Sequence, residues 1–577
     1  MNITLNGVPI VAEPGMTILD VAKENGVIIP TLCHLDIPDI KMINKVASCR
    51  VCMVEVEGRA ALMPACTVKV WDGMAIHTNT RRAISARRTV TELLLSDHPK
   101  DCLVCERNQH CELQNLAAQI NIRETRFEGK SVKHPPDKSS RSLIRYPEKC
   151  VMCRRCETMC NEVQTVGVYS GIYRSLEAII GTAFDYPVLD TSCTFCGQCV
   201  SVCPTGALVL RTDVGKVWNA INDPDKVVVV QAAPAIRTAL GEEFGMPEGE
   251  RVTGKMVASL RRLGFDYVYD TCFAADLTVL EEATEFIDRL KNGGSLPMLT
   301  SCCPAWVKFI EHQFPDMLQV PSTCKSPHEM FGAIAKTYLA QKLGIAPEKM
   351  VVVSIMPCLA KKYEAARSEL SEDGLADVDL VLTTTELAAM LREAGINFNI
   401  LPDEEFDSVM GESSGAGVIF GKTGGVIEAT IRTAASWLQG KDIEEVEFKE
   451  LHQMEGMREA DVTIAGEVYK IGIAHGLGNA RMLLENIRAG KSKYHAIEIM
   501  ACPGGCVGGG GQPHHHNDTK VLTKRAKSLL DEDKDKKVRL SHENSEIKAL
   551  YKDFLGEIGG HKAHELLHTT FTKRTKL

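Results

Sequence analysis

The sequence lacks the features of membrane, exported and nucleic-acid-binding proteins. No apolar run reaches the ~18 residues that a membrane-spanning helix needs. The first residues, MNITLNGVPIV, lack the basic segment and long apolar stretch of an export signal. The formal net charge of −9 at pH 7 argues against partners rich in phosphate, such as nucleic acid or anionic lipid. We therefore expect a cytoplasmic protein that binds neither nucleic acid nor membranes.

Aromatic residues are scarce as well, whereas cysteine is abundant, with 22 cysteines in 577 residues. In an exported protein so many cysteines would indicate disulfides. Here most of them fall into close C-x-x-C groups in a chain without an export signal, which favours metal binding. The spacing within each group indicates which metal.

The most specific pattern is a duplicated cysteine run in the middle of the chain. Each copy reads C-x2-C-x2-C-x3-C, and the second ends in Cys-Pro. In bacterial ferredoxins such runs bind two 4Fe–4S clusters, and the fourth cysteine of each copy binds the other cluster. Paired zinc sites are the alternative. One predicted cluster is held by Cys150, Cys153, Cys156 and Cys203. The other is held by Cys193, Cys196, Cys199 and Cys160.

A second group lies in the first 80 residues, where alternating apolar and polar residues predict a small mixed sheet with one helix near 17–25. One distant cysteine, a C-x2-C pair and a further cysteine resemble the ligand set of a 2Fe–2S ferredoxin-like domain. Zinc is again the alternative. The expected ligands are Cys33, Cys49, Cys52 and Cys66.

A third group lies between two predicted helices in 81–125 and offers one imidazole and three thiolates. Alone, this set is compatible with a zinc site. Beside three other predicted iron–sulfur sites we expect a His-ligated 4Fe–4S cluster, whose potential is raised because imidazole carries no negative charge. The expected ligands are His98, Cys102, Cys105 and Cys111.

From about residue 226, apolar strands alternate with helices, which is typical of a mostly parallel α/β domain. Three predicted strands end in cysteine, at Cys302–Cys303, Cys358 and Cys502. Because sites in open α/β sheets form at the carboxyl ends of strands, we expect these strand ends to meet in one site. The charged, helical tail after about 517 is expected to wrap over the surface.

The sequence around these cysteines resembles the iron-only (FeFe) hydrogenases. The signatures of that family's catalytic domain occur as TSCCPAW at 300–306, MPCLAKKYE at 356–364 and EIMACPGGCVGGGGQP at 498–513. The resemblance covers essentially the whole chain and implies a multidomain protein. Its parts would be a β-grasp 2Fe–2S ferredoxin-like domain (1–80), a small His/Cys cluster domain (81–125), a bacterial 2x4Fe–4S ferredoxin domain (140–212), a large two-lobed α/β hydrogenase domain (220–515) and a C-terminal helical extension (516–577).

The resemblance also implies the catalytic cofactor. This is the H-cluster, a 4Fe–4S cube bridged to a two-iron unit with CO, cyanide and an azadithiolate. The cube would be bound by Cys303, Cys358, Cys502 and Cys506, and Cys506 would also bridge to the two-iron unit. The residues expected to wall the pocket are Ala233, Pro234, Pro327, Met356, Phe420 and Met500.

By the same resemblance, Cys302 would be the first proton carrier and Lys361 would donate to a cyanide. The rest of the proton route would be Glu282, Ser322 and Glu285, with Arg289 at its outer end. Residue chemistry agrees: Glu282 and Glu285, three apart on a predicted helix, share one face and can relay a proton. A solvated helix face is the alternative reading of this E-E-x-x-E segment alone.

The expected reaction is the reversible conversion of two protons and two electrons into H2, fed by an intramolecular iron–sulfur relay. No Rossmann fingerprint or flavin site is evident, so we expect NAD(P) to be used by a partner. The chain would then be the catalytic subunit of an NAD(P)- and ferredoxin-linked, electron-bifurcating complex with flavin-binding and small iron–sulfur subunits. The alternatives are a stand-alone ferredoxin-dependent hydrogenase and a non-catalytic iron–sulfur electron-transfer or assembly protein.

Overall fold

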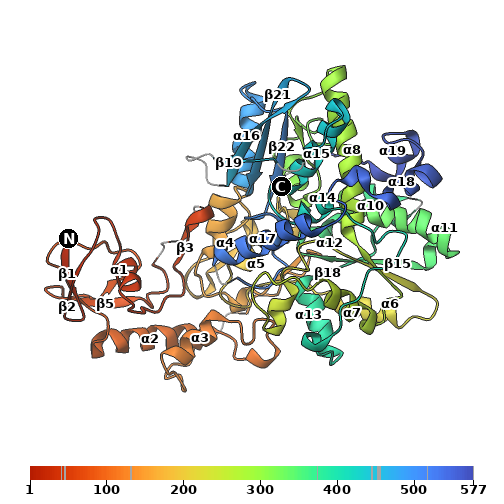
Figure 1. Cartoon of the computed structure of the whole chain (residues 1–577). Coiled ribbons are helices and arrows are strands. Elements are labelled where there is room, and N and C mark those ends of the chain that lie inside the picture. Colours follow the sequence, from red (N-terminus) through yellow and green to blue (C-terminus); the bar gives the residue numbers. More distant parts are fainter. Residues whose placement is uncertain are drawn as a thin grey trace. The chain divides into compact units, whose positions relative to one another are not determined.

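A computed structural model describes residues 1–40, 42–44, 47–129, 133–372, 374–443, 446–450, 456–515 and 518–575. The chain divides into two compact units (Figure 1). Unit 1 comprises Met1–Glu162, Gly167–Thr191 and Cys199–Val209, and unit 2 comprises Val163–Val166, Ser192–Gln198 and Leu210–Leu577. Within the described ranges, none of the helices combines the length and the apolar character that crossing a membrane requires.

Unit 1 begins with the predicted mixed sheet, in the order β2–β1–β7–β5–β6. Helix α1 (Ile18–Glu24) covers this core, and Thr17 caps it by exchanging hydrogen bonds with Asp20. The alternating pattern thus places Ile3, Leu5 and other apolar side chains on the buried face. The strands are β1 (Asn2–Leu5), β2 (Val8–Val11), β5 (Met53–Val56), β6 (Met63–Pro64) and β7 (Ala75–His77).

The remainder of unit 1 carries the cysteine-rich loops on short elements. Helices α2 (Arg81–Asp97) and α3 (Glu112–Gln119) flank the loop with the third cysteine group, as predicted. The strands between the cysteine runs, β9 (Ser170–Ile172) and β10 (Ile179–Gly181), form an antiparallel pair. These loops are therefore held by little regular structure.

Unit 2 contains two sheets. The first has the order β13–β12–β15–β18 and is entirely parallel. Its valine-rich strands are buried, as expected for a parallel sheet covered on both faces. The strands are β12 (Val227–Ala232), β13 (Tyr267–Asp270), β15 (Met350–Met356) and β18 (Leu380–Thr383).

The second sheet has the order β14–β22–β21–β20–β19 and is mixed. β14 and β21 run parallel to β22, whereas β20 runs antiparallel to β21. A tight turn through Ala465 and Gly466, both with positive φ, makes this hairpin possible. The predicted parallel pattern therefore holds for the first sheet and in part for the second. The strands are β14 (Met298–Leu299), β19 (Lys449–Glu450), β20 (Met457–Ile464), β21 (Glu467–His475) and β22 (Ala496–Met500).

Helices pack on both sheets, and α8 packs against α10 and α15. The helices of this part are α6 (Val214–Ile221), α7 (Thr253–Leu263), α8 (Thr271–Asn292), α9 (Pro304–Gln313), α10 (Pro327–Ile334), α11 (Ala340–Leu343), α12 (Ala360–Glu364), α13 (Thr384–Glu393), α14 (Gly415–Val418), α15 (Gly425–Gln439) and α16 (Leu477–Arg488).

The C-terminal tail is helical, as predicted, but the expectation of a surface wrap is wrong. Its helices are α17 (Thr519–Asp535), α18 (Ser545–Leu550) and α19 (His561–Leu567). Leu529, Ile547 and Leu567 are fully buried, and Arg525 lies in the core with its guanidinium bonded to Glu242. The charged residues that suggested a surface segment include ion-pair partners of buried groups, so the tail is part of the core of unit 2.

Candidate functional site

The cysteines at three strand ends meet in unit 2, as the sequence predicts. Cys303 directly precedes helix α9 in the segment after β14, Cys358 follows β15, and Cys502 follows β22. Their proximity shows in the electrostatics: burial and the neighbouring thiolates of Cys358, Cys303 and Cys506 raise the pKa of Cys502. The strands come from both sheets, because β14 and β22 are neighbours in one and β15 lies in the other.

The glycine-rich segment after Cys506 explains how this cysteine joins the others. Gly511 donates its N–H to the Pro357 carbonyl at 2.9 Å. A Cβ on Gly509 would lie 2.2 Å from the same carbonyl oxygen, so only glycine allows this approach. The segment therefore lies directly against the loop that carries Cys358.

The chemistry of this donor set fits an iron–sulfur cube. None of the 22 cysteines, all of which lie in the described part of the chain, forms a disulfide. Burial, followed by the charges of neighbouring thiolates, raises the pKa of Cys358 and raises that of Cys506 to about 12. Four thiolates in one place, three of them buried and that of Cys506 partly buried, need positive charge, which cluster iron supplies.

Cys302 lies beside this set and has no place in a four-thiolate cube. It is partly buried, and burial together with the charge of Glu282 raises the pKa of its thiol. The Lys361 ammonium donates to the Cys302 carbonyl oxygen at 3.1 Å. Cys302, Glu282 and Lys361, which the sequence predicts at one site, are therefore neighbours.

Glu282 is fully buried in helix α8, and its Oε1 atom has no hydrogen-bond partner among the described residues. Its Oε2 atom accepts a long bond of 3.4 Å from Thr430. Burial, and then the charge of Glu285, raises the pKa of Glu282 to about 8. A carboxyl group with this pKa can both hold and release a proton near neutral pH.

The next residues of the predicted route are directly bonded. Glu285 Oε2 accepts from the Ser322 hydroxyl at 2.8 Å, and Glu285 Oε1 accepts from Arg289 at 2.5 Å. Glu285 and Arg289 are half-buried on α8, one turn apart. The structure thus brings Ser322, Glu285 and Arg289 together in the predicted order.

Residues that sequence reasoning missed surround Lys361. Its ammonium donates to Glu364 Oε2 at 2.7 Å, and His328 Nε2 lies 2.8 Å from the same oxygen. The Glu364 carboxylate raises the pKa of Lys361 although burial opposes this. Glu364 follows Lys361 by three residues on one helix, a spacing that the sequence offers, whereas no local signal marks His328.

The six predicted pocket residues lie at the ends of secondary-structure elements of unit 2, and all are buried except Pro327, which is half-buried. Ala233 follows β12, while Met356 and Met500 are the last residues of β15 and β22. Pro327 is the first residue of α10, and Phe420 lies in the turn after α14. Pro234 is next to Ala233. Their contacts with a cofactor stay predictions.

In unit 1, the predicted His98 site is a cavity of about 340 Å³ lined by His98, Cys102, Cys105 and Cys111. His98 Nδ1 is buried without a partner among the described residues. Burial, and then the charge of Lys149, lowers the pKa of His98 to about 4, so the imidazole is neutral and able to bind a metal. A Cβ on Gly206 would lie 2.8 Å from the Cys105 sulfur, so glycine is required there.

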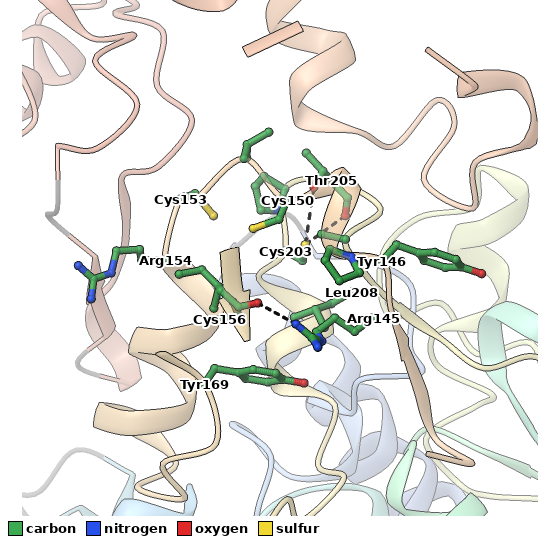
Figure 2. Close-up of a pocket in the computed structure, with 15 residues that line it drawn as sticks. Arg145, Tyr146, Cys150, Cys153, Arg154, Cys156, Tyr169, Cys203, Thr205 and Leu208 are labelled. Atoms are coloured by element: carbon green, nitrogen blue, oxygen red, sulfur yellow. Dashed lines mark hydrogen bonds between the residues drawn. The ribbon is translucent and has the colours of Figure 1, made fainter. Parts of the chain in front are cut away.

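The first predicted ferredoxin-type site is also assembled in unit 1. Cys150, Cys153, Cys156 and Cys203 line one cavity, which Figure 2 shows. Burial and the charges of the other thiolates raise the pKa of Cys153 and Cys156. Of the second predicted set, Cys160 and Cys199 belong to unit 1, and Cys193 and Cys196 to unit 2.

The predicted 2Fe–2S ligands are buried beside the N-terminal sheet. A hydrogen bond from Cys49 lowers the pKa of Cys33 to about 5, and one from Cys66 lowers that of Cys52 to about 7. The charge of Cys33 also acts on Cys52 and Cys66. The four sulfurs therefore form one group.

Two polar residues that the sequence did not single out connect the sites of unit 1. Asn44 is fully buried and donates to the carbonyls of Cys33, at 2.7 Å, and Cys153, at 2.9 Å. Arg107, from the loop of the His98 site, donates to the Cys203 carbonyl at 2.7 Å. The predicted 2Fe–2S site and the His98 site thus both adjoin the site of Cys150, Cys153, Cys156 and Cys203.

Comparisons with known families agree with this arrangement. Residues 226–510 match the iron-only hydrogenase large subunit, C-terminal domain, and residues 519–574 match the iron hydrogenase small subunit. Residues 1–81 match a 2Fe–2S cluster binding domain and residues 186–209 a 4Fe–4S binding domain. Residues 87–126 match the NADH-ubiquinone oxidoreductase-G iron–sulfur binding region.

Full-length relatives point the same way. The chain is 55% identical to the NADP-reducing hydrogenase subunit HndD of Solidesulfovibrio fructosivorans, over 100% of both chains. It is 38% identical to iron hydrogenase 1 of Clostridium pasteurianum, over 99% of this chain and 100% of that one. The solved [FeFe]-hydrogenase HydA1 of Chlamydomonas reinhardtii matches 63% of this chain and 99% of its own at 41% identity and a TM-score of 0.58. The chain belongs to the iron-only hydrogenases and is an oxidoreductase that acts on hydrogen.

Proposed function

We propose that Cys303, Cys358, Cys502 and Cys506 hold the cube of the H-cluster. The observation that carries this assignment is the meeting of four thiols, three of them buried, beside Cys302, whose own thiol is not needed as a ligand. When bound, the cluster supplies the two-electron exchange with dihydrogen. Hydrogen evolution with a dithionite-reduced dye tests the activity. If matured protein evolves no hydrogen, the chain is a non-catalytic electron carrier.

The side chains around the site move and place protons. Cys302 exchanges a proton with the buried Glu282, whose free Oε1 atom offers an acceptor. Ser322 links the route to Glu285, which Arg289 holds by its other oxygen. Lys361, fixed by Glu364 and the Cys302 carbonyl, places one ammonium beside Cys302, where it can donate to a cyanide. Ala233, Pro234, Pro327, Met356, Phe420 and Met500 enclose the pocket.

The accessory cysteine sets would hold the iron–sulfur clusters that supply electron transfer to the site. The contacts of Asn44 and Arg107 join two N-terminal clusters to the cluster of Cys150, Cys153, Cys156 and Cys203. Within unit 1, the charge of Cys199 acts on Cys156. Within unit 2, the charge of Cys196 acts on Cys502. Unit 1 would therefore offer the relay two inputs, the predicted 2Fe–2S site and the His98 site.

The chain works as the catalytic subunit of an NAD(P)-linked complex, with a flavin-binding partner and small iron–sulfur subunits. The full-length similarity to a subunit of an NADP-reducing hydrogenase supports this. Coupling to ferredoxin, and bifurcation of electrons between the two carriers, belong to the same proposal. The alternative is a stand-alone, ferredoxin-dependent hydrogenase. Purification from the native host distinguishes the two, because a subunit of a complex should copurify with flavoprotein subunits and a stand-alone enzyme should not.

Iron content follows from the proposed ligand sets. One 2Fe–2S cluster, three accessory 4Fe–4S clusters and the H-cluster amount to about 20 iron atoms per chain. Protein made without the maturation machinery for the two-iron unit should hold about 18 and be inactive. Metal analysis checks this, and stoichiometric zinc with little iron would contradict it.

His98→Cys should retain its cluster and lower the cluster's potential. Thiolate is the commoner ligand, and it adds negative charge where the neutral imidazole now lies. A redox titration followed by EPR measures the change. If every cluster keeps its potential, His98 is not a ligand.

A further inference from the structure

The outer end of the proposed proton route needs a group that loses and regains a proton, and Arg289 does not meet this need. A guanidinium stays protonated at all ordinary pH values. Arg289 donates to Glu285 and to the carbonyls of Val320 and Pro321, both at 2.8 Å. These bonds fix the Glu285 carboxylate in place. Arg289 is therefore an anchor for Glu285, and the exchange with water must happen elsewhere.

The second oxygen of Glu285 leads to such a group. Glu285 Oε2 accepts from the Thr323 backbone N–H at 3.0 Å and lies 3.4 Å from the Thr323 hydroxyl. The Thr323 hydroxyl lies 2.7 Å from His568 Nδ1. The same Oε2 atom accepts from Ser322, on the inward side of the route. Glu285 Oε2 thus joins the inward branch to an outward branch through Thr323.

His568 is held in this position by the C-terminal tail. Thr569 donates its N–H to the Thr323 carbonyl, and Lys325 donates to the Leu567 carbonyl, both at 2.8 Å. His568 and Cys324 face each other in this antiparallel bridge. The tail therefore fixes His568 against the segment that carries Thr323.

The surroundings of the imidazole suit proton exchange. His568 Nε2 lies 3.0 Å from Glu281, a buried carboxylate on α8 that also accepts from Tyr551 and the Gly559 N–H. The His568 side chain is 7% exposed, and its ring lies 4.2 Å from that of His564, which is exposed. The other titratable groups near its ring nitrogens are Glu285 and Cys324. An imidazole has two ring nitrogens, either of which can donate or accept a proton, whereas a guanidinium has donors only.

We infer that His568 is the residue through which the proton route exchanges protons with solvent, by way of Thr323 and Glu285. The inference rests on the proposed function, because it takes Glu285 as part of the route. Of the described residues that hydrogen bonds connect to Glu285, His568 is the one with an imidazole side chain. The C-terminal tail would thus contribute a proton-transfer residue to the catalytic domain.

The transfer balances in both directions. Inward, the Nδ1–H bond of the His568 imidazolium breaks and its proton forms an O–H bond on Thr323, as the original Thr323 proton passes to Glu285. His568 is left neutral, with its proton on Nε2 facing Glu281. If the ring turns toward the exposed His564, a hydronium ion of the solvent can give its proton to the bare Nδ1 and is left as water. In hydrogen oxidation each step runs in reverse.

The test uses matured, full-length enzyme. His568→Gln keeps a hydrogen-bonding group but cannot titrate, and it should lower turnover by about 10²-fold, the lower end for a positioned proton-transfer group. Thr323→Val removes the linking hydroxyl but leaves His568 in the sequence, and it should lower turnover by a similar factor. Thr323→Ser keeps the hydroxyl and should retain the rate. His561→Gln is the matched control, because His561 is an exposed histidine in helix α19, which ends one residue before His568. Iron content and the infrared bands of CO and cyanide should not change in any variant.

Chemical rescue separates proton transfer from structure. Added imidazole should restore part of the turnover of His568→Gly in proportion to its concentration, and should not affect Thr323→Val. The inference is overturned if His568→Gln or Thr323→Val turns over at the wild-type rate. It is also overturned if imidazole fails to rescue His568→Gly while its infrared bands are intact. If Glu282→Gln is fully active too, the proposed route fails as a whole; if only His568→Gln is active, the route stands without this outlet.

Discussion

Cys302→Ala is expected to leave the H-cluster in place and to lower hydrogen turnover by orders of magnitude. Four other cysteines supply the proposed cube, so the iron content and the CO and cyanide infrared bands should stay nearly unchanged. Positioned acid–base transfer is worth about 10²–10⁴-fold, and Cys302 is the proposed carrier next to the cluster. Alanine has no exchangeable side-chain proton, so Glu282 loses the thiol with which it is proposed to exchange protons.

Three further variants make this result specific. Cys302→Asp restores an exchangeable proton and should recover part of the rate with a changed pH optimum. Cys303→Ala removes a proposed ligand, so its infrared bands should weaken or vanish. Cys272→Ala is the matched control, because Cys272 is also a buried cysteine outside any disulfide, but it is bonded to Arg237 and belongs to no proposed ligand set. Wild-type turnover in Cys302→Ala would remove Cys302 from the proton route.

Much of the site was predictable because its cysteines are encoded locally. The ligand runs have fixed short spacings, so Cys150, Cys153 and Cys156 could be grouped without knowledge of the fold. The meeting of Cys303, Cys358 and Cys502 followed from a general property of α/β sheets, in which strand ends gather residues from distant segments. The apolar strands that place these cysteines, among them β12, β15 and β22, were predictable from their hydrophobic runs.

Contacts between distant segments were not predictable in the same way. Asn44 bonds to Cys153 across 109 positions, and His568 bonds to Thr323 across 245. No periodicity marks either residue, because each acts through one or two hydrogen bonds and not through a repeated face. The burial of the C-terminal tail escaped prediction for a related reason. Arg525, for example, is charged and yet fully buried, because Glu242, far away in the sequence, pairs with it.

Glu282→Gln is expected to abolish most turnover and at the same time to stabilise the protein at alkaline pH. Glutamine cannot release a proton, so turnover should fall by about 10²–10⁴-fold. The stability effect follows from the pKa of Glu282, which burial raises to about 8. Between the ordinary pKa of a glutamate and this value, the folded protein binds a proton that the unfolded chain has lost. The contribution of Glu282 to stability therefore falls as pH rises through this window, and glutamine removes that dependence.

Melting temperatures at pH 5 and pH 8 measure this effect. The gain in melting temperature of Glu282→Gln over the wild type should be larger at pH 8, where the wild type must bury a charge or retain a proton. Glu311→Gln gives the opposite result, since Glu311 is a buried carboxylate paired with Arg367 and Arg574. Its loss should lower the melting temperature and spare turnover. Glu282 would then be a buried acid that lowers stability but is needed for turnover, so its role is to carry a proton. Glu311 would be a buried acid that raises stability but is not needed for turnover, so its role is to pair its charge. If Glu282→Gln is fully active and melts at the wild-type temperature at pH 8, Glu282 neither carries the proton nor lowers stability at that pH.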